Sequence, residues 1–299
     1  MATEVSVAPA DASGQDLSES IRVLVPERNI RQDLRAAGIV WRRELIRFRN
    51  DRLRAVTGLV QPVLFLFVLG SGLASLLPRQ GGGLDFRTFM FPGVLAMVVL
   101  FTSIFSAASI VWDREFGFLR EMLVAPVSRA ALVVGKCLGG ATVATLQGIV
   151  ILILAGLAHV PYSPELFVVL IGELLLLSFT LTAFGVMMAA RIKQIQAFMA
   201  LTQMLVLPLF FLSGALYPLT GLPSWLAVLT RFDPLTYIVD PMRRAVFAHL
   251  HVSPLAAHAL APGVTWSGWQ VPQGLSLGLV AIMGLGMLVI AILEFRKTE

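Results

Sequence analysis

The chain has 299 residues, of which 57% are hydrophobic and 14% are charged, and its mean hydropathy is +0.82. Soluble domains carry about 25% charged residues, so this composition excludes a soluble globular protein, and it also excludes disordered, collagen-like and disulfide-scaffold classes. A formal net charge of +5 would favour nucleic acid as a partner of a soluble protein, but in a membrane protein it indicates basic residues in cytoplasmic loops. We therefore expect an all-α polytopic membrane protein with no nucleic-acid partner.

The N-terminal part of the chain divides into a polar tail and a basic segment. Residues 1–20 contain four acidic residues, no basic residue and no apolar core, so they do not form a cleavable signal peptide, and we expect residues 1–30 to be a disordered cytoplasmic tail. Residues 31–54 predict an amphipathic helix on the inner membrane surface, which anchors the first span or also contributes to a docking surface for a cytoplasmic partner. Its apolar stripe is Leu34, Ala37, Trp41, Leu45 and Phe48, flanked by Arg35, Arg42, Arg43, Arg47 and Arg49.

Six apolar stretches are long enough to cross a membrane, because a helix needs about 20 apolar residues to span the hydrocarbon core. Long intervals between charged residues delimit the first four, Pro218 and Pro223 follow the fifth, and a segment rich in histidine, tryptophan and proline precedes the sixth. Of the 23 basic residues, 18 fall on the side that holds both termini, which predicts cytoplasmic N and C termini. The predicted spans are about 55–77, 88–112, 132–158, 166–190, 197–217 and 273–293.

The loop at residues 113–129 connects the second and third spans and has an amphipathic pattern of its own. Its apolar face is formed by Phe116, Leu119 and Leu123, and its charged face by Asp113, Arg114, Arg120 and Glu121. Pro126 ends the pattern, so we expect a short cytoplasmic helix that is continuous with two spans. The spacing alone leaves open whether this helix docks a partner or only fixes the topology.

Polar residues are rare inside the predicted spans. Glu173 is the one ionisable residue well inside a span, and it belongs either to a substrate path or proton relay, or to a structural hydrogen bond with Gln147 or Gln203. Gln61 precedes Pro62, which predicts a kink with a polar patch. The single cysteine, Cys137, excludes an intrachain disulfide, and we expect it to be structural.

Glycines at helical spacing predict close contacts between helices, within one subunit or between two. They are Gly135, Gly139 and Gly140 in the third span, and Gly274 and Gly278 in the sixth.

Prolines, aromatic residues and charges alternate between the fifth and sixth spans, which predicts short re-entrant or interfacial helices covered by protein. Asp233 or Asp240 could form an ion pair there with Arg231, Arg243 or Arg244. On the residues alone, such a pair would brace the fold.

Three segments resemble the permease subunit of type-2 ATP-binding-cassette (ABC) exporters, a family that includes antibiotic-efflux, lipooligosaccharide and polysaccharide exporters. They are FPGVLAM (91–97), DREFGFLREMLVAPVSRAALVVGK (113–136) and LSGALYPLTGLPSWLAVLTRFDPLTYIVDPMRRAV (212–246). The resemblance covers nearly the whole chain after about the first 25 residues. It implies that the loop after the second span is a coupling helix that seats in an ATPase subunit. The residues that would carry this role are Arg114, Glu115, Phe116, Gly117, Arg120, Glu121 and Pro126.

The same resemblance implies that spans one, two and five border the translocation route, which makes Gln61 and Gln203 candidate path residues. Glu173 is the third candidate, because it is an ionisable residue inside the fourth span. The resemblance places Asp233, Tyr237 and Asp240 near an outer gate. It further implies a homodimer that works with two ATPase subunits in the inner membrane of a prokaryote. The ATPase subunits would bind ATP and magnesium, and the cargo would be a drug-like, lipid-linked or glycan molecule.

The chain itself is expected to have no ATPase activity, cofactor, metal or catalytic residues. The phosphate-binding motif GxxxxGK[ST] is absent, since Gly135 and Lys136 are followed by Cys137 and preceded by Ala130 at the position of the first glycine. Two other functions stay open. An ion- or proton-coupled transporter would need several buried carboxylates and two related halves. A membrane-embedded enzyme would need paired catalytic groups at one depth.

Overall fold

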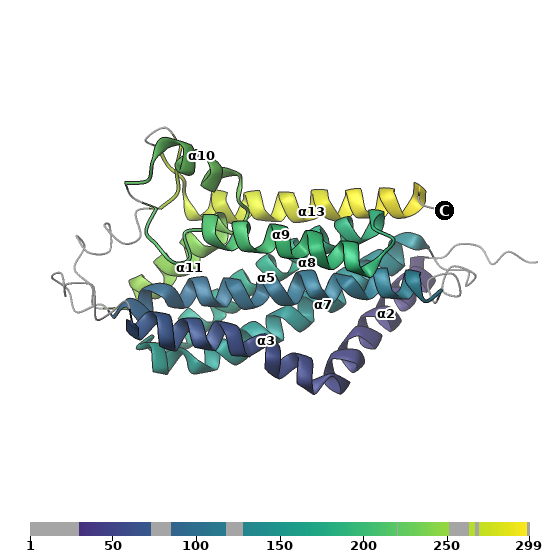
Figure 1. The fold of residues 1–299 in the computed structure, drawn as a ribbon, viewed down its shortest axis with the longest axis horizontal. Helices are drawn as coiled ribbons and strands as arrows, with labels where there is room; N and C mark the ends of the chain where they lie inside the picture. Colours follow the sequence, from purple (N-terminus) through teal and green to yellow (C-terminus); the bar gives the residue numbers. More distant parts are fainter. Residues whose placement is uncertain are drawn as a thin grey trace, which may run out of the picture.

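The computed structural model describes residues 30–72, 85–117, 128–219, 221–250, 263–266 and 269–297. Six of its helices are long and apolar enough to cross a membrane, which confirms the predicted all-α polytopic class and the number of spans (Figure 1). The candidate spans are Arg52–Gly72, which contains α3 (Arg52–Leu64) and the π-helix η1 (Phe65–Leu69); α5 (Phe86–Glu115); α7 (Arg129–Ile153) with the 3₁₀ helix η2 (Leu154–Ala158); α8 (Pro164–Arg191); α9 (Ile195–Leu212); and α13 (Gln273–Lys297).

Helix α5 is the centre of the bundle. Every residue from 88 to 100 is buried, because α5 packs against α7, α8, α9 and α3. A helix that is apolar on all sides and covered on all sides forms a core rather than a lipid-facing surface. The outward faces of α3, α9 and α13 carry exposed aliphatic side chains instead, which suits contact with lipid or another apolar surface.

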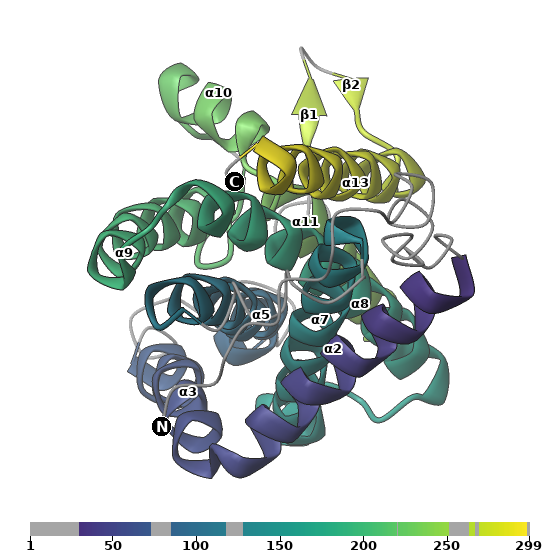
Figure 2. The ribbon, with the colours of Figure 1, turned by 90° about the vertical axis from the view of Figure 1, so that its right-hand side faces the viewer.

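Helix α2 (Ile30–Asn50) lies across the end of α7 and is separate from the first span (Figure 2). The sequence predicted a helix over 31–54, but the helix ends at Asn50. The Asp51 carboxylate accepts a hydrogen bond from the Arg54 amide at 3.1 Å and caps α3 as a new helix.

The face of α2 that packs on α7 overlaps only in part with the apolar stripe predicted for the membrane surface. Ala37 is buried against α7, whereas Leu34 and Trp41 are 68% and 38% exposed. The face that packs on α7 is made of small residues and one carboxylate, namely Ala36, Ala37, Val40 and Glu44. Small side chains occupy this face because α2 approaches the α7 backbone too closely for large ones.

Two short helices lie between the fifth and sixth spans, α10 (Ser224–Phe232) and α11 (Thr236–Ala248), as the punctuated sequence predicted. Helix α11 is largely buried against α5, α8 and α13. A two-stranded hairpin follows, in which β1 (Thr265–Trp266) pairs antiparallel with β2 (Trp269–Gln270). The sequence analysis did not predict this hairpin, because two-residue strands carry no periodic signal.

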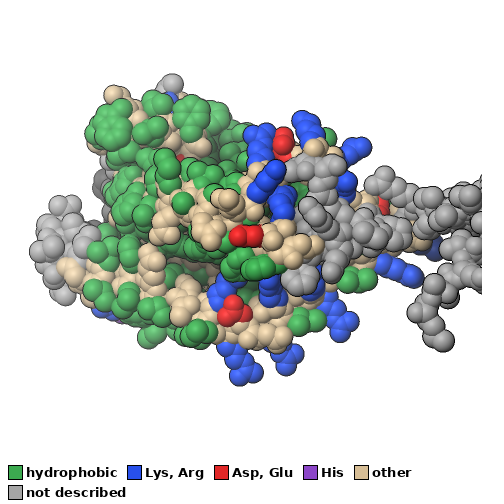
Figure 3. Space-filling view, turned by 45° about the vertical axis from the view of Figure 1, so that its right-hand side comes forward, with side chains coloured by type: hydrophobic (Ala, Val, Ile, Leu, Met, Phe, Trp, Pro, Cys, Tyr) green, Lys and Arg blue, Asp and Glu red, His purple; other side chains and the backbone are tan. Residues whose placement is uncertain are grey.

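Charged side chains gather at one end of the molecule, and hydrophobic side chains cover much of the remaining surface in this view (Figure 3). The charged end holds α2, the end of α5, the start of α7 and the C-terminal ends of α8 and α13. Arg191, Arg296 and Lys297 lie in the last turns of α8 and α13, where cations also interact favourably with the helix dipole. This segregation is the three-dimensional form of the charge asymmetry seen in the sequence.

Candidate functional site

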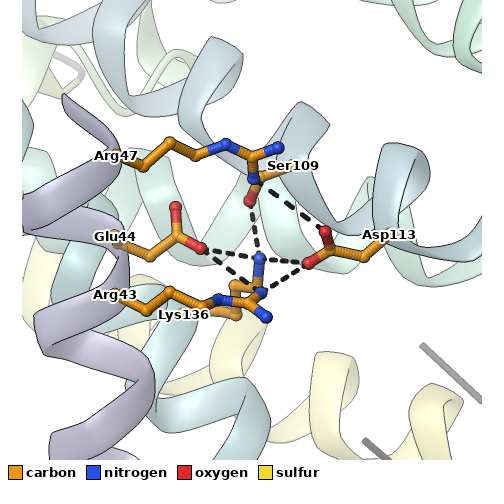
Figure 4. Close-up of polar contacts among 6 residues, drawn as sticks. All are labelled: Arg43, Glu44, Arg47, Ser109, Asp113 and Lys136. Atoms are coloured by element: carbon orange, nitrogen blue, oxygen red, sulfur yellow. Dashed lines mark hydrogen bonds and ion pairs between the residues drawn. The ribbon is translucent and has the colours of Figure 1, made fainter. Parts of the chain in front are cut away.

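A buried ion cluster joins three helices at the charged end of the bundle (Figure 4). The Lys136 amine on α7 lies 2.7 Å from a Glu44 oxygen on α2 and 2.7 Å from an Asp113 oxygen on α5, and it donates to the Ser109 hydroxyl at 2.9 Å. All three ionised side chains are less than a tenth exposed. A buried amine between two carboxylates is stable only as a complete set, since removing one member leaves an uncompensated charge.

Two arginines on α2 complete the cluster on its more solvent-exposed side. Arg43 donates to the Asp113 carboxylate at 2.7 Å, whereas Arg47 lies 3.9 Å from the same carboxylate and 5.8 Å from the centre of the Trp112 ring. Both arginine side chains are about two-fifths exposed. We call this set the charged cluster; its members are Arg43, Glu44, Arg47, Ser109, Asp113 and Lys136.

Glycines on α7 bring the charged cluster together. A Cβ atom on Gly135 would lie 2.7 Å from the Ala37 carbonyl oxygen, and one on Gly139 would lie 2.7 Å from the Glu44 Cβ atom. Neither distance is sterically possible, so glycine is required at both positions for α2 to cross α7 at this depth. Lys136 sits between them and therefore meets Glu44 directly.

The predicted close contacts of Gly135 and Gly139 thus occur within one chain. Gly140 likewise packs against Thr182 of α8 and Ser106 of α5. The other predicted pair differs, because no atom of the described residues lies within 4 Å of a Cβ built on Gly274 or Gly278. That pair faces away from the packed part of the described chain.

A cavity of about 410 Å³ adjoins the charged cluster and shares three of its side chains. It lies between α2, α3, α5, α7 and α9. Its lining comprises Glu44, Arg47, Phe48, Asp51, Arg54, Thr57, Gly58, Gln61, Pro62, Phe101, Thr102, Phe105, Ser106, Ser109, Val143, Gln147 and Gln203. Charged, neutral polar and aromatic groups all line this volume, which is large enough for part of an amphiphilic molecule.

Two of the three predicted path residues, Gln61 and Gln203, line this cavity. The third, Glu173, does not; it is buried on α8, and its carboxylate accepts a hydrogen bond from Gln273 of α13 at 3.2 Å. The predicted partners Gln147 and Gln203 are therefore wrong. The physical reason is that α13 packs along α8 and presents Gln273 to Glu173.

Gln147 has its own role in the cavity wall. Its amide donates to the Ala55 carbonyl of α3 at 2.8 Å and accepts a hydrogen bond from Thr102 of α5. It therefore ties three spans together around the cavity. Pro62 follows Gln61 on the same wall, and the π-helix η1 begins three residues later at Phe65, so the predicted irregularity is a widened helical turn.

The predicted coupling loop lies only partly within the described residues. Arg120, Glu121 and Pro126 fall outside them, and the structure therefore leaves the predicted helix untested. Helix α5 continues through Glu115, and Gly117 follows with a positive φ of 83°. Phe116 is 71% exposed at this point.

Arg114 and Glu115 are engaged with the corner between α8 and α9. Arg114 donates to the carbonyls of Ala189 and Ile192 at 3.0 and 2.8 Å, and the Glu115 carboxylate accepts from the Ile195 amide at 3.0 Å. These contacts satisfy backbone groups that helix ends leave without partners. Both residues thus link the end of α5 to the neighbouring spans.

The start of α7 is fastened in a similar way. The Ser128 amide donates to Asp33 of α2 at 3.1 Å, and Arg129 donates to the carbonyls of Phe295 and Arg296 at the end of α13, both at 3.3 Å. The two chain segments that flank residues 118–127 are therefore bonded to α2, α8, α9 and α13.

The predicted gate residues lie in a buried polar region around α11. Asp240 lies 2.6 Å from Arg244, which is one of the predicted ion pairs. Tyr237 donates to the Arg231 carbonyl at 2.8 Å and accepts from the Trp266 indole at 3.0 Å, so it joins α10 to the hairpin.

Asp233 makes no ion pair within the described residues. One of its oxygens accepts from the Leu235 amide at 2.9 Å at the start of α11. Burial raises the pKa of this carboxyl to about 8.

Arg243 is buried, and its contacts differ from the aspartate ion pair that the sequence suggested. Its guanidinium donates to the carbonyls of Gly214 and Ala215 at 2.7 and 3.2 Å and lies 4.0 Å from the centre of the Phe89 ring. It thereby holds α11 against the turn after α9 and against α5.

Comparison with known proteins now identifies the fold. Residues 35–247, from α2 to α11, match the family model described as "ABC-2 type transporter". The chain belongs to the ABC-2 type transporter family. This confirms the resemblance found in the sequence, and the match covers the charged cluster and the whole cavity lining.

Curated relatives of this ABC-2 chain include two named as permeases and one named for nodulation. A putative transport permease, ycf38, of Cyanophora paradoxa is 28% identical over 87% of each chain. Nodulation protein J of Rhizobium leguminosarum bv. trifolii is 27% identical over 75% of this chain and 88% of its own. A probable multidrug ABC transporter permease, YbhR, of Escherichia coli K12 is 28% identical over 52% of this chain and 43% of its own.

Sequence reasoning missed the charged cluster of this ABC-2 chain. Asp113 follows the predicted second span and Lys136 lies a few residues inside the third, both close to a cytoplasmic loop where charges ordinarily fix topology. The available signal was the position of Lys136 between Gly135 and Gly139, which brings a neighbouring helix onto it. Among the described residues, no group of three His, Cys, Asp or Glu side chains could hold a metal ion.

Proposed function

We propose that this ABC-2 chain is the permease subunit of an ATP-driven exporter that moves an amphiphilic substrate outward across the cytoplasmic membrane of a prokaryote. The observation that carries the proposal is the cavity of about 410 Å³ among α2, α3, α5, α7 and α9, in a chain that belongs to a transporter family. Its lining combines charged, amide, hydroxyl and aromatic groups, as an amphiphile requires.

Energy would come from a separate polypeptide. We expect two permease chains and two ABC ATPase subunits, with ATP and magnesium bound by the latter and with both permease termini on the cytoplasmic side. The gathering of basic residues at the end that holds α2 and the end of α13 supports this orientation.

Residues 114–126 would receive the movement of the ATPase. The contacts at either side of this loop support the proposal. Arg114 and Glu115 bind the α8–α9 corner, and Arg129 binds the end of α13. Asp113 belongs to the charged cluster, which shares Glu44, Arg47 and Ser109 with the cavity lining. Because packed helices move between discrete arrangements, a shift of this loop would reach the cavity wall.

The relatives support transport without choosing a cargo. One is named for multidrug transport, one for nodulation and one only as a putative transport permease. A drug-like molecule, a lipid-linked molecule and a glycan therefore all remain within the proposed substrate class, and efflux of an antibiotic is one form that the function could take.

Charge reversal in the loop tests the coupling. The chain is co-expressed with the ABC ATPase encoded beside it, and the purified complex is assayed for subunit association and for ATP hydrolysis in liposomes. We expect Arg120→Glu and Glu121→Arg to lower both by at least about ten-fold, because reversed charges repel across a docked surface. Arg231→Glu makes the same change at the α10 end of the bundle and should leave both near the wild-type level. Association and hydrolysis that survive both loop reversals would overturn the docking assignment.

A further inference from the structure

Two arginines face the cavity with donors to spare. Arg54 lies in the first turn of α3 and is half-buried, and within the described residues no carboxylate oxygen lies within 4 Å of its guanidinium. Arg47 lines the same cavity from the last turns of α2, and its contact with Asp113 is long, at 3.9 Å. A guanidinium carries five N–H donors, so both groups can accept an anion.

The carboxylates nearby are already committed to other groups. Glu44 lies 2.7 Å from the Lys136 amine, and Asp113 lies 2.7 Å from both Lys136 and Arg43. Asp51 accepts the Arg54 backbone amide and caps α3. The cavity lining itself carries two cations, Arg47 and Arg54, and two carboxylates, Glu44 and Asp51. With the rest of the charged cluster included, the region holds four cations against three carboxylates, so positive charge is in excess by one.

The cavity becomes less polar with distance from these arginines. Thr57 and Gln61 lie on the same side of the cavity along α3, and Gln61 is seven residues beyond Arg54, which is about 10 Å along a helix. On α5, the rings of Phe101 and Phe105 stack with centroids 6.3 Å apart and line the cavity beside Thr102. The lining therefore changes from charged, around Arg47 and Arg54, to neutral polar and aromatic.

We infer that this cavity binds an anionic amphiphile, with a phosphate or carboxylate headgroup held by Arg47 and Arg54 and an apolar body against Phe101 and Phe105. Arginine suits this task because its planar fork binds such oxyanions in a bidentate manner. The inference deepens the proposed function and depends on it only for the claim that the bound molecule is cargo. The same chemistry could come from a resident anionic phospholipid.

A binding experiment tests the site directly. The permease–ATPase complex is purified in an uncharged detergent and titrated with phosphatidylglycerol or phosphatidylcholine that carry the same fluorescent acyl chain, and binding is followed by anisotropy. We expect the wild type to bind phosphatidylglycerol at least about ten-fold more tightly than phosphatidylcholine, because charge-assisted hydrogen bonds distinguish the two headgroups. Arg54→Gln and Arg47→Gln should each reduce this preference to less than about three-fold.

Arg49→Gln is the matched control, because Arg49 is exposed on α2 and lies outside the cavity lining. It should keep the wild-type preference. If Arg49→Gln lost the preference for phosphatidylglycerol equally, the lipid would be attracted by surface charge in general. If the wild type showed no preference, the site would not distinguish the two headgroups. Either result overturns the inference. Arg54→Lys keeps the positive charge and controls for misfolding caused by substitution at this position. Its preference for phosphatidylglycerol should stay within about three-fold of the wild-type preference.

A second measurement distinguishes cargo from resident lipid. In liposomes that contain the complex, chemical quenching reports whether the fluorescent phosphatidylglycerol crosses to the other leaflet when ATP is added. ATP-dependent movement that is lost in Arg54→Gln identifies the anionic amphiphile as cargo. Arginine-dependent binding without movement identifies a resident lipid, which supports the site equally. A complex that binds this lipid but hydrolyses no ATP would overturn the proposed exporter function and not the binding site.

Discussion

The Lys136 amine lies 2.7 Å from the Glu44 carboxylate, so α7 and α2 are joined by a buried ion pair in the wall of the cavity. Helix α2 is therefore more than a surface anchor. Its buried face carries one side of an electrostatic contact that the central helix α5 also joins through Asp113. A displacement of α2 along α7 would break this pair, so α2 has a defined position on α7 and would move between distinct positions rather than slide continuously.

Replacing Lys136 with methionine should destabilise the permease strongly. The change keeps the side-chain volume but leaves two buried carboxylates without their shared cation, which costs about 3–5 kcal/mol in comparable buried pairs. The measurement is the apparent melting temperature of the purified permease in detergent. Lys193→Met is the control, because Lys193 is exposed. Equal melting temperatures for the two variants would mean that Lys136 is not charged in the native cluster.

The same cluster predicts partial rescue. Glu44→Gln combined with Lys136→Met removes one of the orphaned charges, so the double variant should be more stable than the sum of the two single losses predicts. Contacting residues of this kind show coupling energies of about 0.5–3 kcal/mol. A double-mutant cycle on melting temperatures or on denaturant unfolding measures this coupling. Strict additivity would argue against a direct contact between the two side chains.

Alanine at Gly139 should weaken the docking of α2. The added Cβ atom would lie 2.7 Å from the Glu44 Cβ atom, so α2 must move outward, and overpacking of this kind costs about 1–3 kcal/mol. Gly172→Ala makes the same chemical change where no atom of the described residues lies within 4 Å, and there helix propensity alone should make it neutral or slightly stabilising. The melting temperature should therefore fall in Gly139→Ala and stay unchanged or rise slightly in Gly172→Ala, and a fall in both variants would contradict the close-contact explanation.

Replacing Arg243 with methionine should make the turn after α9 open more often. The guanidinium satisfies the Gly214 and Ala215 carbonyls and packs on Phe89, and its removal leaves these buried acceptors without donors. A reporter cysteine at Ser213, which is 1% exposed, reads this change when Cys137 is replaced by alanine. Labelling of the reporter by a soluble maleimide should be at least about five-fold faster in Arg243→Met, since buried thiols react only on opening.

Arg231→Met serves as the control for this labelling experiment. Among the described residues, the Arg231 side chain makes no hydrogen bond or ion pair with the turn, although the Arg231 carbonyl accepts from Tyr237. Its labelling rate should stay at the wild-type level. A reporter that reacts equally fast in all three proteins would show that Arg243 does not hold the turn.

The sequence predicted the number and approximate place of the spans because intervals between charges report hydrocarbon thickness directly. It misplaced the break between α2 and α3, since Asp51 looked like one more charge in a basic helix and its capping role depends on backbone geometry. The contact between α2 and α7 was not predicted. The stripe with Leu34 and Trp41 indicates only where the helix would meet the membrane surface, whereas contact with the α7 glycines selects small side chains such as Ala36 and Ala37.

The site was predictable only in part. Gln61 and Gln203 could be chosen because they are polar side chains in two of the spans that the family resemblance places beside the route, and both line the cavity. Glu173 was chosen as an ionisable residue inside a span, but it lies elsewhere, and its depth along the span did not tell which neighbour it faces. Asp113 and Lys136 were missed for a related reason, since a charge near the end of a span looks the same in the sequence whether it meets water or another charge.

Stability should depend on pH through Asp233. Burial raises the pKa of its carboxyl to about 8 from an ordinary value of 3.8, so the native protein holds a proton that the unfolded chain releases. The stabilisation from this proton is present at low pH and is lost as the pH rises from about 4 to about 8. Asp233→Asn mimics the neutral form and retains an oxygen for the Leu235 amide. The melting temperature of Asp233→Asn should therefore exceed that of the wild type by more at about pH 8.5 than at about pH 5.5. Other titrating groups contribute equally to both proteins at each pH, so their effects cancel in this difference. An equal difference at both values would mean that Asp233 is ionised in the folded protein throughout.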